Sequence, residues 1–313
     1  MIKIYSPASI GNVNVGFDTL GIALSRIDKG ILGDLITISS SNKFILINKG
    51  IFLNDLPKNN YENIIFHCWI KFCKKIGKKI PIKIILEKNV PVASGLGSSA
   101  CSIVAFLKAI NLFCNNPLNN LDLLKLMGKL EGLLSGNIHY DNIVPCLLGG
   151  MKLILINNKN NLIIQNVPIF KNWFWVIAYP GIKLSTFGSR KILPKLYKKE
   201  ILIKQSQYLA GFINASHTKK ELLASKLMQD FIAEPYRKSL IPNFKKISYI
   251  AKKLGALNYG ISGSGPTIFS IFNNLSYANK MVIWLKKNYL KNNTGFVYVC
   301  KINNIGTQIM EKK

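Results

Sequence analysis

A run of small residues in the first half of the chain has the composition of a loop that binds phosphate. These residues, called here the phosphate loop, are Pro91, Val92, Ala93, Ser94, Gly95, Leu96, Gly97, Ser98, Ser99, Ala100 and Cys101. Glycines let the backbone approach a ligand closely, and the apolar run that follows predicts a helix whose first amides attract an anion. A serine cap alone would explain one serine but not the whole run. No Gly-Lys-Ser/Thr follows, so this is not a Walker loop.

Arginine is rare here and is therefore informative. Only Arg26, Arg190 and Arg237 are arginines among the 42 basic residues, which leaves 39 lysines. A planar guanidinium binds a carboxylate or phosphate through two parallel hydrogen bonds, and lysine cannot reproduce that geometry. We therefore expect a site that needs this geometry to have kept its arginines.

The phosphate loop resembles that of the GHMP kinases, which are small-molecule kinases of galactose, homoserine, mevalonate and phosphomevalonate. Further segments resemble the homoserine kinase branch of that family, namely residues 6–18, 131–142, 179–190, 233–237 and 260–266. The resemblance implies an α+β, two-domain GHMP kinase fold. Residues 1–160 would form an N-terminal domain like ribosomal protein S5, which carries the phosphate loop, and residues 161–313 a C-terminal ferredoxin-like α+β domain.

The resemblance also implies a reaction, transfer of the γ-phosphoryl group of ATP to the side-chain hydroxyl of L-homoserine, a step towards threonine. A kinase must hold the phosphates and magnesium and aim the acceptor hydroxyl at the phosphorus. Magnesium is a hard cation that takes oxygen ligands. The resemblance assigns it to a loop serine and to Glu131. We prefer Ser99 over Ser98 because Ser99 lies nearest the expected helix start.

Homoserine is a zwitterion with a primary hydroxyl, so its pocket needs groups for both charges. The resemblance assigns Arg190 and Arg237 to the carboxylate, and Asp18, with Asn12 beside it, to the ammonium. It places Thr186 on the substrate side of the pocket.

The reacting hydroxyl needs polar neighbours, and the resemblance assigns His139 and Asn142 to it. Asp141 is the acid that matches the proposed base of mevalonate-kinase-like relatives, whereas homoserine kinases are thought to work without a dedicated base. We prefer a positioning role for Asp141, and the role of base stays open. Gly263 belongs to a glycine run that would close the site from the second domain.

Strands and helices must position these residues. Period-two patterns and turn signals predict strands over residues 2–6, 35–39, 44–48, 82–87, 150–157, 174–179, 267–272 and 295–301. Helices are predicted to start at residue 100 and to cover 61–76, 120–131, 204–216, 220–232, 244–254 and 277–290. After the polar tract 157–161, the second half therefore resembles a separate α+β domain.

The charge of the chain suggests another class of protein. The 42 basic and 14 acidic residues give a net charge of +28, which usually indicates a nucleic-acid or anionic-surface partner. The lysines are scattered along the chain with many isoleucines and asparagines, the residues that A/T-rich codons encode. We therefore attribute the charge to genome drift and expect no nucleic-acid partner.

Compartment and assembly are expectations of the same kind. No apolar run reaches the roughly 18 residues of a membrane span, Met1 is followed by no signal pattern, and the six cysteines form no Cys-x-x-Cys pair. We expect a cytoplasmic protein with reduced thiols and no membrane partner. The family is commonly dimeric, so a homodimer is expected.

Two alternatives stay open. One is a related kinase that acts on mevalonate or a sugar, which would not need Asp18 for an ammonium. The other is a basic nucleic-acid-binding protein, whose affinity would fall steeply with salt.

Overall fold

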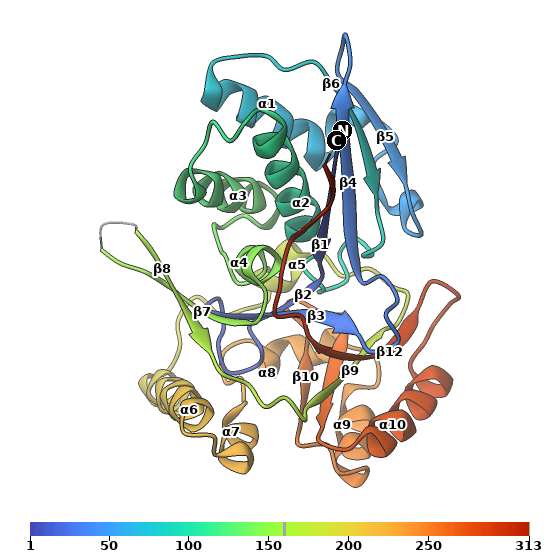
Figure 1. The fold of residues 1–313 in the computed structure, drawn as a ribbon. Coiled ribbons are helices and arrows are strands. Elements are labelled where there is room, and N and C mark those ends of the chain that lie inside the picture. The colour runs from blue at the N-terminus through green and yellow to red at the C-terminus, as the bar shows by residue number, and fades with distance from the viewer. Residues whose placement is uncertain (159–160, 313) are drawn as a thin grey trace.

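The computed structural model describes residues 1–158 and 161–312, together with all side chains in these ranges except that of Ser135. Figure 1 shows two sheets, one above the other, with the ends of the chain side by side at the first sheet. Among the described residues, no helix is both long and apolar enough to cross a bilayer.

The first sheet packs against the helix that follows the phosphate loop. Its strand order is β13-β1-β4-β6-β5, and only β5 and β6 run parallel. The strands are β1 (Ile2–Pro7), β4 (Gly33–Ser40), β5 (Ile45–Lys49), β6 (Ile82–Glu87) and β13 (Gln308–Lys312). Residues of β6 alternate between buried and partly exposed, as expected of a strand with one face on the core.

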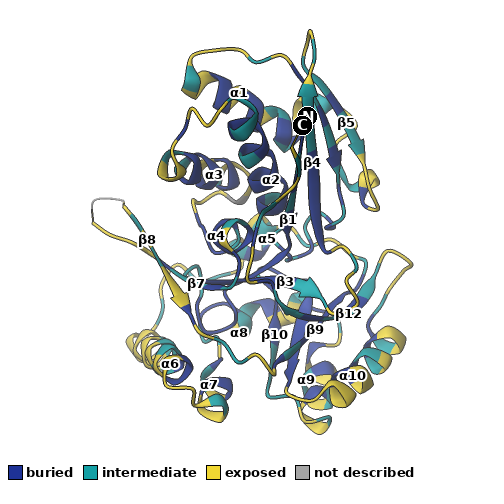
Figure 2. Cartoon of the chain, viewed as in Figure 1, coloured by how far each residue is buried: buried dark blue, intermediate teal, exposed yellow. Residues whose placement is uncertain are grey.

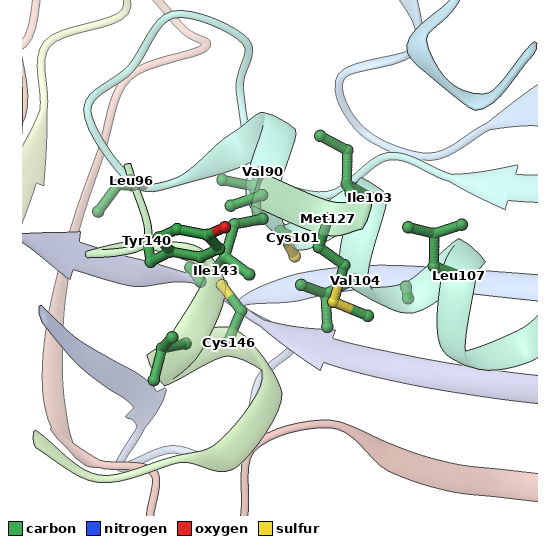
Figure 3. Close-up of a cluster of buried hydrophobic side chains, with 14 of the residues drawn as sticks. Val90, Leu96, Cys101, Ile103, Val104, Leu107, Met127, Tyr140, Ile143 and Cys146 are labelled. Carbon is green, nitrogen blue, oxygen red and sulfur yellow. The ribbon is translucent and has the colours of Figure 1, made fainter. Parts of the chain in front are cut away.

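Helices cover one face of this sheet (Figure 1). They are α1 (Ile64–Ile76), α2 (Ser98–Phe113), α3 (Asn120–Ser135) and α4 (Ile143–Leu148). Helix α2 lies between the sheet and the other helices, and most of its residues are buried, so it is enclosed by the core. Figure 3 shows part of its contact, where Val104 and Leu107 lie with Met127 of α3 and Cys146 of α4. The phosphate loop is therefore followed by a rigidly packed helix.

The second sheet combines strands from both halves of the chain. Its order is β10-β11-β9-β12-β3-β7-β8, with β2 paired to β3. The strands are β2 (Ser9–Gly11), β3 (Leu20–Arg26), β7 (Met151–Ile156), β8 (Leu162–Val167), β9 (Phe174–Tyr179), β10 (Asn258–Ile261), β11 (Ile268–Phe272) and β12 (Phe296–Ile302). Strands β3 and β7 precede residue 160, while β13 of the first sheet follows it.

The remaining helices lie around the second sheet. They are α5 (Thr186–Lys191), α6 (Lys199–His217), α7 (Glu221–Leu227), α8 (Glu234–Arg237), α9 (Phe244–Lys253) and α10 (Leu275–Asn288). Helices α9 and α10 pack on its strands, whereas α6 and α7 pair with each other. Much of the surface of α6 is exposed (Figure 2).

Several expected boundaries need correction. The helix expected to start at residue 100 starts at Ser98, and those expected over 120–131 and 204–216 are Asn120–Ser135 and Lys199–His217. Residues 82–87 and 174–179 form strands as predicted, but the helix predicted over 220–232 ends at Leu227. Beyond it, the carboxylate of Asp230 accepts hydrogen bonds from the amides of Ile232 and Ala233, a local turn that competes with the helix. The sequence also gave no indication of β2, β3, β8, β10, β13, α4, α5 and α8.

The expected division into residues 1–160 and 161–313 stays a prediction. Residue 160 itself lies outside the described residues. On either side of it, strand pairing ties the two halves together, because each sheet takes strands from both.

Candidate active site

The phosphate loop joins β6 to α2, and its glycines have conformations that other residues rarely adopt. Gly95 and Gly97 have φ of +83° and +63°. A Cβ atom on Gly95 would lie 2.3 Å from the carbonyl oxygen of Ser262, and one on Gly97 would lie 2.2 Å from Ser9 Oγ. Both positions therefore require glycine.

The glycine run of residues 260–266 packs against this loop, as the resemblance implied. Ser262 Oγ donates to the carbonyl oxygen of Gly95 at 2.6 Å. The amide of Thr267, the next residue after the run, donates to the carbonyl oxygen of Ser94 at 3.0 Å. The two halves of the chain thus meet at the loop.

A buried ion pair supports both ends of the loop, and no pattern in the sequence predicted it. Lys88 Nζ donates to Asp34 Oδ2 at 2.5 Å, to the carbonyl oxygen of Ser98 at 2.9 Å and to Ser102 Oγ at 2.9 Å. The other oxygen of Asp34 accepts the amides of Asn89 and Val90. Since both charged side chains are almost fully buried, this network ties β4, the end of β6 and the first turn of α2 together.

A cavity of about 370 Å³ opens beside the loop. It brings together most of the residues predicted for the site, namely Asn12, Val92, Ala93, Ser94, Gly95, Gly97, Ser98, Ser99, Glu131, His139, Asp141, Asn142, Thr186, Arg190, Arg237 and Gly263. Pro91, Leu96, Ala100, Cys101 and Asp18 are not in its lining. Leu96, Ala100 and Cys101 are instead fully buried in the core.

One end of the cavity was missed from the sequence. Leu56, Pro57 and Ile64 line it, next to the carboxylates of Asp55 and Glu62. Asp55, Leu56, Pro57 and Glu62 lie between β5 and α1, and Ile64 is the first residue of α1. This stretch has no glycine-rich or repeated pattern. Only the fold brings them to the phosphate loop.

The two serines at the start of α2 have different partners. Ser98 Oγ donates to the carbonyl oxygen of Val90 at 3.0 Å and is thereby used within the loop. Ser99 Oγ donates to Glu131 Oε1 at 2.8 Å. Burial raises the pKa of Glu131, although the charge of nearby His139 opposes this. A hydroxyl and a carboxylate side by side are suitable oxygen donors for magnesium. Among the described residues, no group of three or more His, Cys, Asp or Glu side chains forms a metal site.

His139 and Asp141 form a buried pair, with Nδ1 2.6 Å from Asp141 Oδ1. Burial lowers the pKa of His139, but the carboxylates of Asp141 and Glu131 outweigh it and raise that pKa to about 9. Burial likewise raises the pKa of Asp141, but the charge of His139 prevails and lowers it. At neutral pH the imidazole is therefore a cation that donates from both nitrogens.

Asn142 and the second ring nitrogen of His139 complete this group. Asn142 donates to Asp141 Oδ2 at 3.4 Å and accepts from Ser9 Oγ at 2.9 Å. Among the described residues, His139 Nε2 is buried and has no hydrogen-bond partner. This N–H is available to a ligand in the cavity.

Arg190 and Arg237 lie close together but have different partners. Arg190 donates from Nη1 and Nη2 to the two oxygens of Asp18, at 2.9 and 2.6 Å. The buried Arg237 donates to the carbonyl oxygens of Ser189 and Gly263, at 3.3 and 2.9 Å. Burial lowers the pKa of Arg237, and the charge of Arg190 adds to this effect. A buried cation that donates to neutral oxygens is suited to an anionic ligand.

Comparison with known proteins agrees with this geometry. The family model for the N-terminal domain of the GHMP kinases matches residues 63–150, and that for their C-terminal domain matches residues 216–287. A homoserine kinase from Buchnera aphidicola subsp. Acyrthosiphon pisum is 58% identical over 308 residues, which are 98% of this chain and 99% of that protein. The chain belongs to the homoserine kinase family of the GHMP kinases. This membership confirms the resemblance seen in the motifs.

Solved structures of homoserine kinase and mevalonate kinase have the same fold as this chain. A homoserine kinase from Cytophaga hutchinsonii has a TM-score of 0.86 and 32% identity, and the match covers 99% of this chain and 97% of that one. A mevalonate kinase with 18% identity and a TM-score of 0.72 shares the fold. The expected α+β, two-domain GHMP kinase fold is therefore confirmed, and the chain is a kinase with an alcohol as acceptor.

Proposed function

We propose that this chain transfers the γ-phosphoryl group of ATP to the side-chain hydroxyl of L-homoserine, in the synthesis of threonine. One observation carries the choice of acceptor: Arg190 and Arg237 both line the cavity that begins at the phosphate loop, and Asp18, just outside its lining, pairs with Arg190. A carboxylate and two guanidiniums complement both charges of an amino acid, whereas a sugar has no charge for either to bind.

The ion pair between Asp18 and Arg190 suggests how the acceptor binds. Without a ligand, each charge compensates the other. A zwitterion supplies a carboxylate to Arg190 and an ammonium to Asp18 in the same event, so neither charge is left alone. An acceptor with only one charge leaves the other partner uncompensated, which is costly for a group partly shielded from water.

The phosphate loop would bind ATP through the amides at the start of α2 and the dipole of that helix. Ser99 and Glu131 would hold magnesium, which neutralises the charge of the phosphates when it is bound. The apolar end at Leu56, Pro57 and Ile64 is suited to the base of the nucleotide.

No side chain needs to act as a base in this proposal. His139 is a cation at neutral pH, so it donates from Nε2 rather than accepting the proton of the hydroxyl. Asp141 keeps the imidazole oriented and is itself held by Asn142. The transition state of phosphoryl transfer is loose, so orientation of the hydroxyl matters more than its activation, and its proton passes to a phosphoryl oxygen.

We further propose that the protein works in the cytoplasm as a homodimer, with no membrane or nucleic-acid partner. Dimerisation and compartment rest on the family resemblance and the composition of the chain. A size-exclusion elution volume of the protein that changes when RNA is added, and returns at high salt, would contradict the absence of a nucleic-acid partner.

The test is ADP release with magnesium-ATP and either L-homoserine, L-serine, L-threonine or mevalonate. We expect turnover with homoserine alone. Arg190→Lys and Arg237→Lys should each reduce kcat/KM at least roughly 30-fold, because lysine cannot form two parallel hydrogen bonds to a carboxylate. Turnover on mevalonate would overturn the choice of acceptor. Arg26→Lys is the matched control, since Arg26 pairs with Asp28 away from the cavity.

A further inference from the structure

Phe17 lies next to both arginines of the site but does not line the cavity. Its ring centroid is 5.7 Å from the guanidinium carbon of Arg190 and 5.5 Å from that of Arg237. Both distances are within the range of a cation–π contact, in which the negative face of an aromatic ring attracts a cation. One ring therefore contacts both guanidiniums.

The two arginines need such a neighbour because their charges repel. Arg190 is compensated by Asp18, but the hydrogen bonds of Arg237 among the described residues go to carbonyl oxygens. The charge of Arg190 lowers the pKa of Arg237, which expresses this repulsion. A ring beside both cations attracts each of them without itself occupying any of their N–H donors.

The backbone around Phe17 is built to hold the ring in place. Asn12, Val13, Asn14 and Asp18 all have positive φ, between +48° and +68°. Such conformations persist only where the surroundings enforce them. Asn14 does so by donating to the carbonyl oxygen of Tyr259 at 2.8 Å, and Asn12 by accepting the amide of Asp18 at 2.9 Å.

We propose that Phe17 is a positioning residue for the acceptor's carboxylate: its ring holds Arg190 and Arg237 side by side so that both can bind one carboxylate. This inference rests on the proposed function, because it concerns how the same pocket selects an amino acid. Phe17 acts through the arginines and does not touch the substrate.

The test compares two acceptors that differ only in the carboxylate, L-homoserine and 3-amino-1-propanol. In Phe17→Leu, kcat/KM for homoserine should fall about tenfold, the size of one or two partly buried cation–π contacts. For 3-amino-1-propanol, kcat/KM as an acceptor, or its inhibition constant as a competitor of homoserine, should change less than about twofold. The KM for ATP should also change less than about twofold. Phe17→Tyr keeps the ring and should restore the parent value.

Phe187→Leu is the matched control, because Phe187 is half exposed on α5 and its ring contacts Lys191 instead of an arginine. If Phe17→Leu does not fold, fluorinated phenylalanines at position 17 keep the shape and weaken the negative face, and KM for homoserine should rise with each fluorine.

The other outcomes separate the positioning role of Phe17 from the proposed function. An equal loss with both acceptors, an unchanged kcat/KM in Phe17→Leu, or a KM that does not respond to fluorination would overturn the positioning role of Phe17. A parent enzyme that fails to phosphorylate homoserine at all would overturn the proposed function and, with it, this inference.

Discussion

The buried pair of His139 and Asp141 predicts how the stability of the protein depends on pH. The pKa of His139 is about 9 in the folded protein and 6.5 in its ordinary state. Between these values, the folded state binds one proton more than the unfolded state, so the free energy of unfolding falls as pH rises. The stabilisation is fully present below about pH 6.5 and is lost as pH rises through about 9.

The size of the effect follows from the shift. The difference between about 9 and 6.5, at roughly 1.4 kcal/mol for each pKa unit, corresponds to about 3–4 kcal/mol. Solvent screening reduces this little, because only 5% of the His139 side chain and 4% of that of Asp141 are exposed. Asp141 contributes nothing in this window, since its lowered pKa keeps it ionised in both states.

Urea unfolding between pH 6 and 10 measures this loss, with His139→Gln as the comparison. The buried thiols Cys146 and Cys300 also have raised pKa values, so they too destabilise the folded state above about pH 9. They are present in both proteins, so they cancel in the difference between the two curves, which reports the interaction of His139 with the carboxylates it faces. That difference should shrink by about 3–4 kcal/mol across the window. Parallel curves would refute an imidazolium at position 139.

Three further variants test the loop and its supports. Gly97→Ala puts a Cβ atom 2.2 Å from Ser9 Oγ at a φ of +63°, so KM for ATP should rise more than about tenfold. An unchanged KM would mean that the loop tolerates this side chain. Lys88→Met leaves Asp34 buried without its cation and should cost about 3–5 kcal/mol in urea unfolding, part of which a second change, Asp34→Leu, should restore. Glu131→Gln should raise the magnesium concentration needed for half-maximal rate about tenfold with little effect on unfolding, and an unshifted magnesium titration would remove Glu131 from the metal site.

Patterns within short stretches of sequence predicted the phosphate loop and two of the strands. The phosphate loop needs positive φ at Gly95 and Gly97, and the sequence shows that requirement as glycine itself. Strands β6 and β9 were predicted at both ends because their residues suit a core wherever their partners lie. The arginines were informative because lysine is the common base of this chain.

Other features depend on contacts between distant residues. Asp18 and Arg190 are 172 residues apart, and Lys88 and Asp34 are 54 apart, so no local pattern relates them. Helix α5 was missed because Gly188 and Ser189 are poor helix formers. Its start is stabilised by Ser185, whose side chain accepts the amide of Gly188.

The pairing of β13 with β1 has a consequence for how the protein is made. Ile2 lies opposite Lys312, and β1 is an inner strand of the first sheet only once β13 has joined it. At a synthesis rate of roughly 5–20 residues per second, β1 leaves the ribosome on the order of 15–60 s before its last neighbour does. During that time, one edge of the nascent sheet has unpaired amides and carbonyls that another strand could bind. Chaperone demand should therefore be greatest while the chain is still being translated, and removal of residues 308–312 would make this exposed edge permanent.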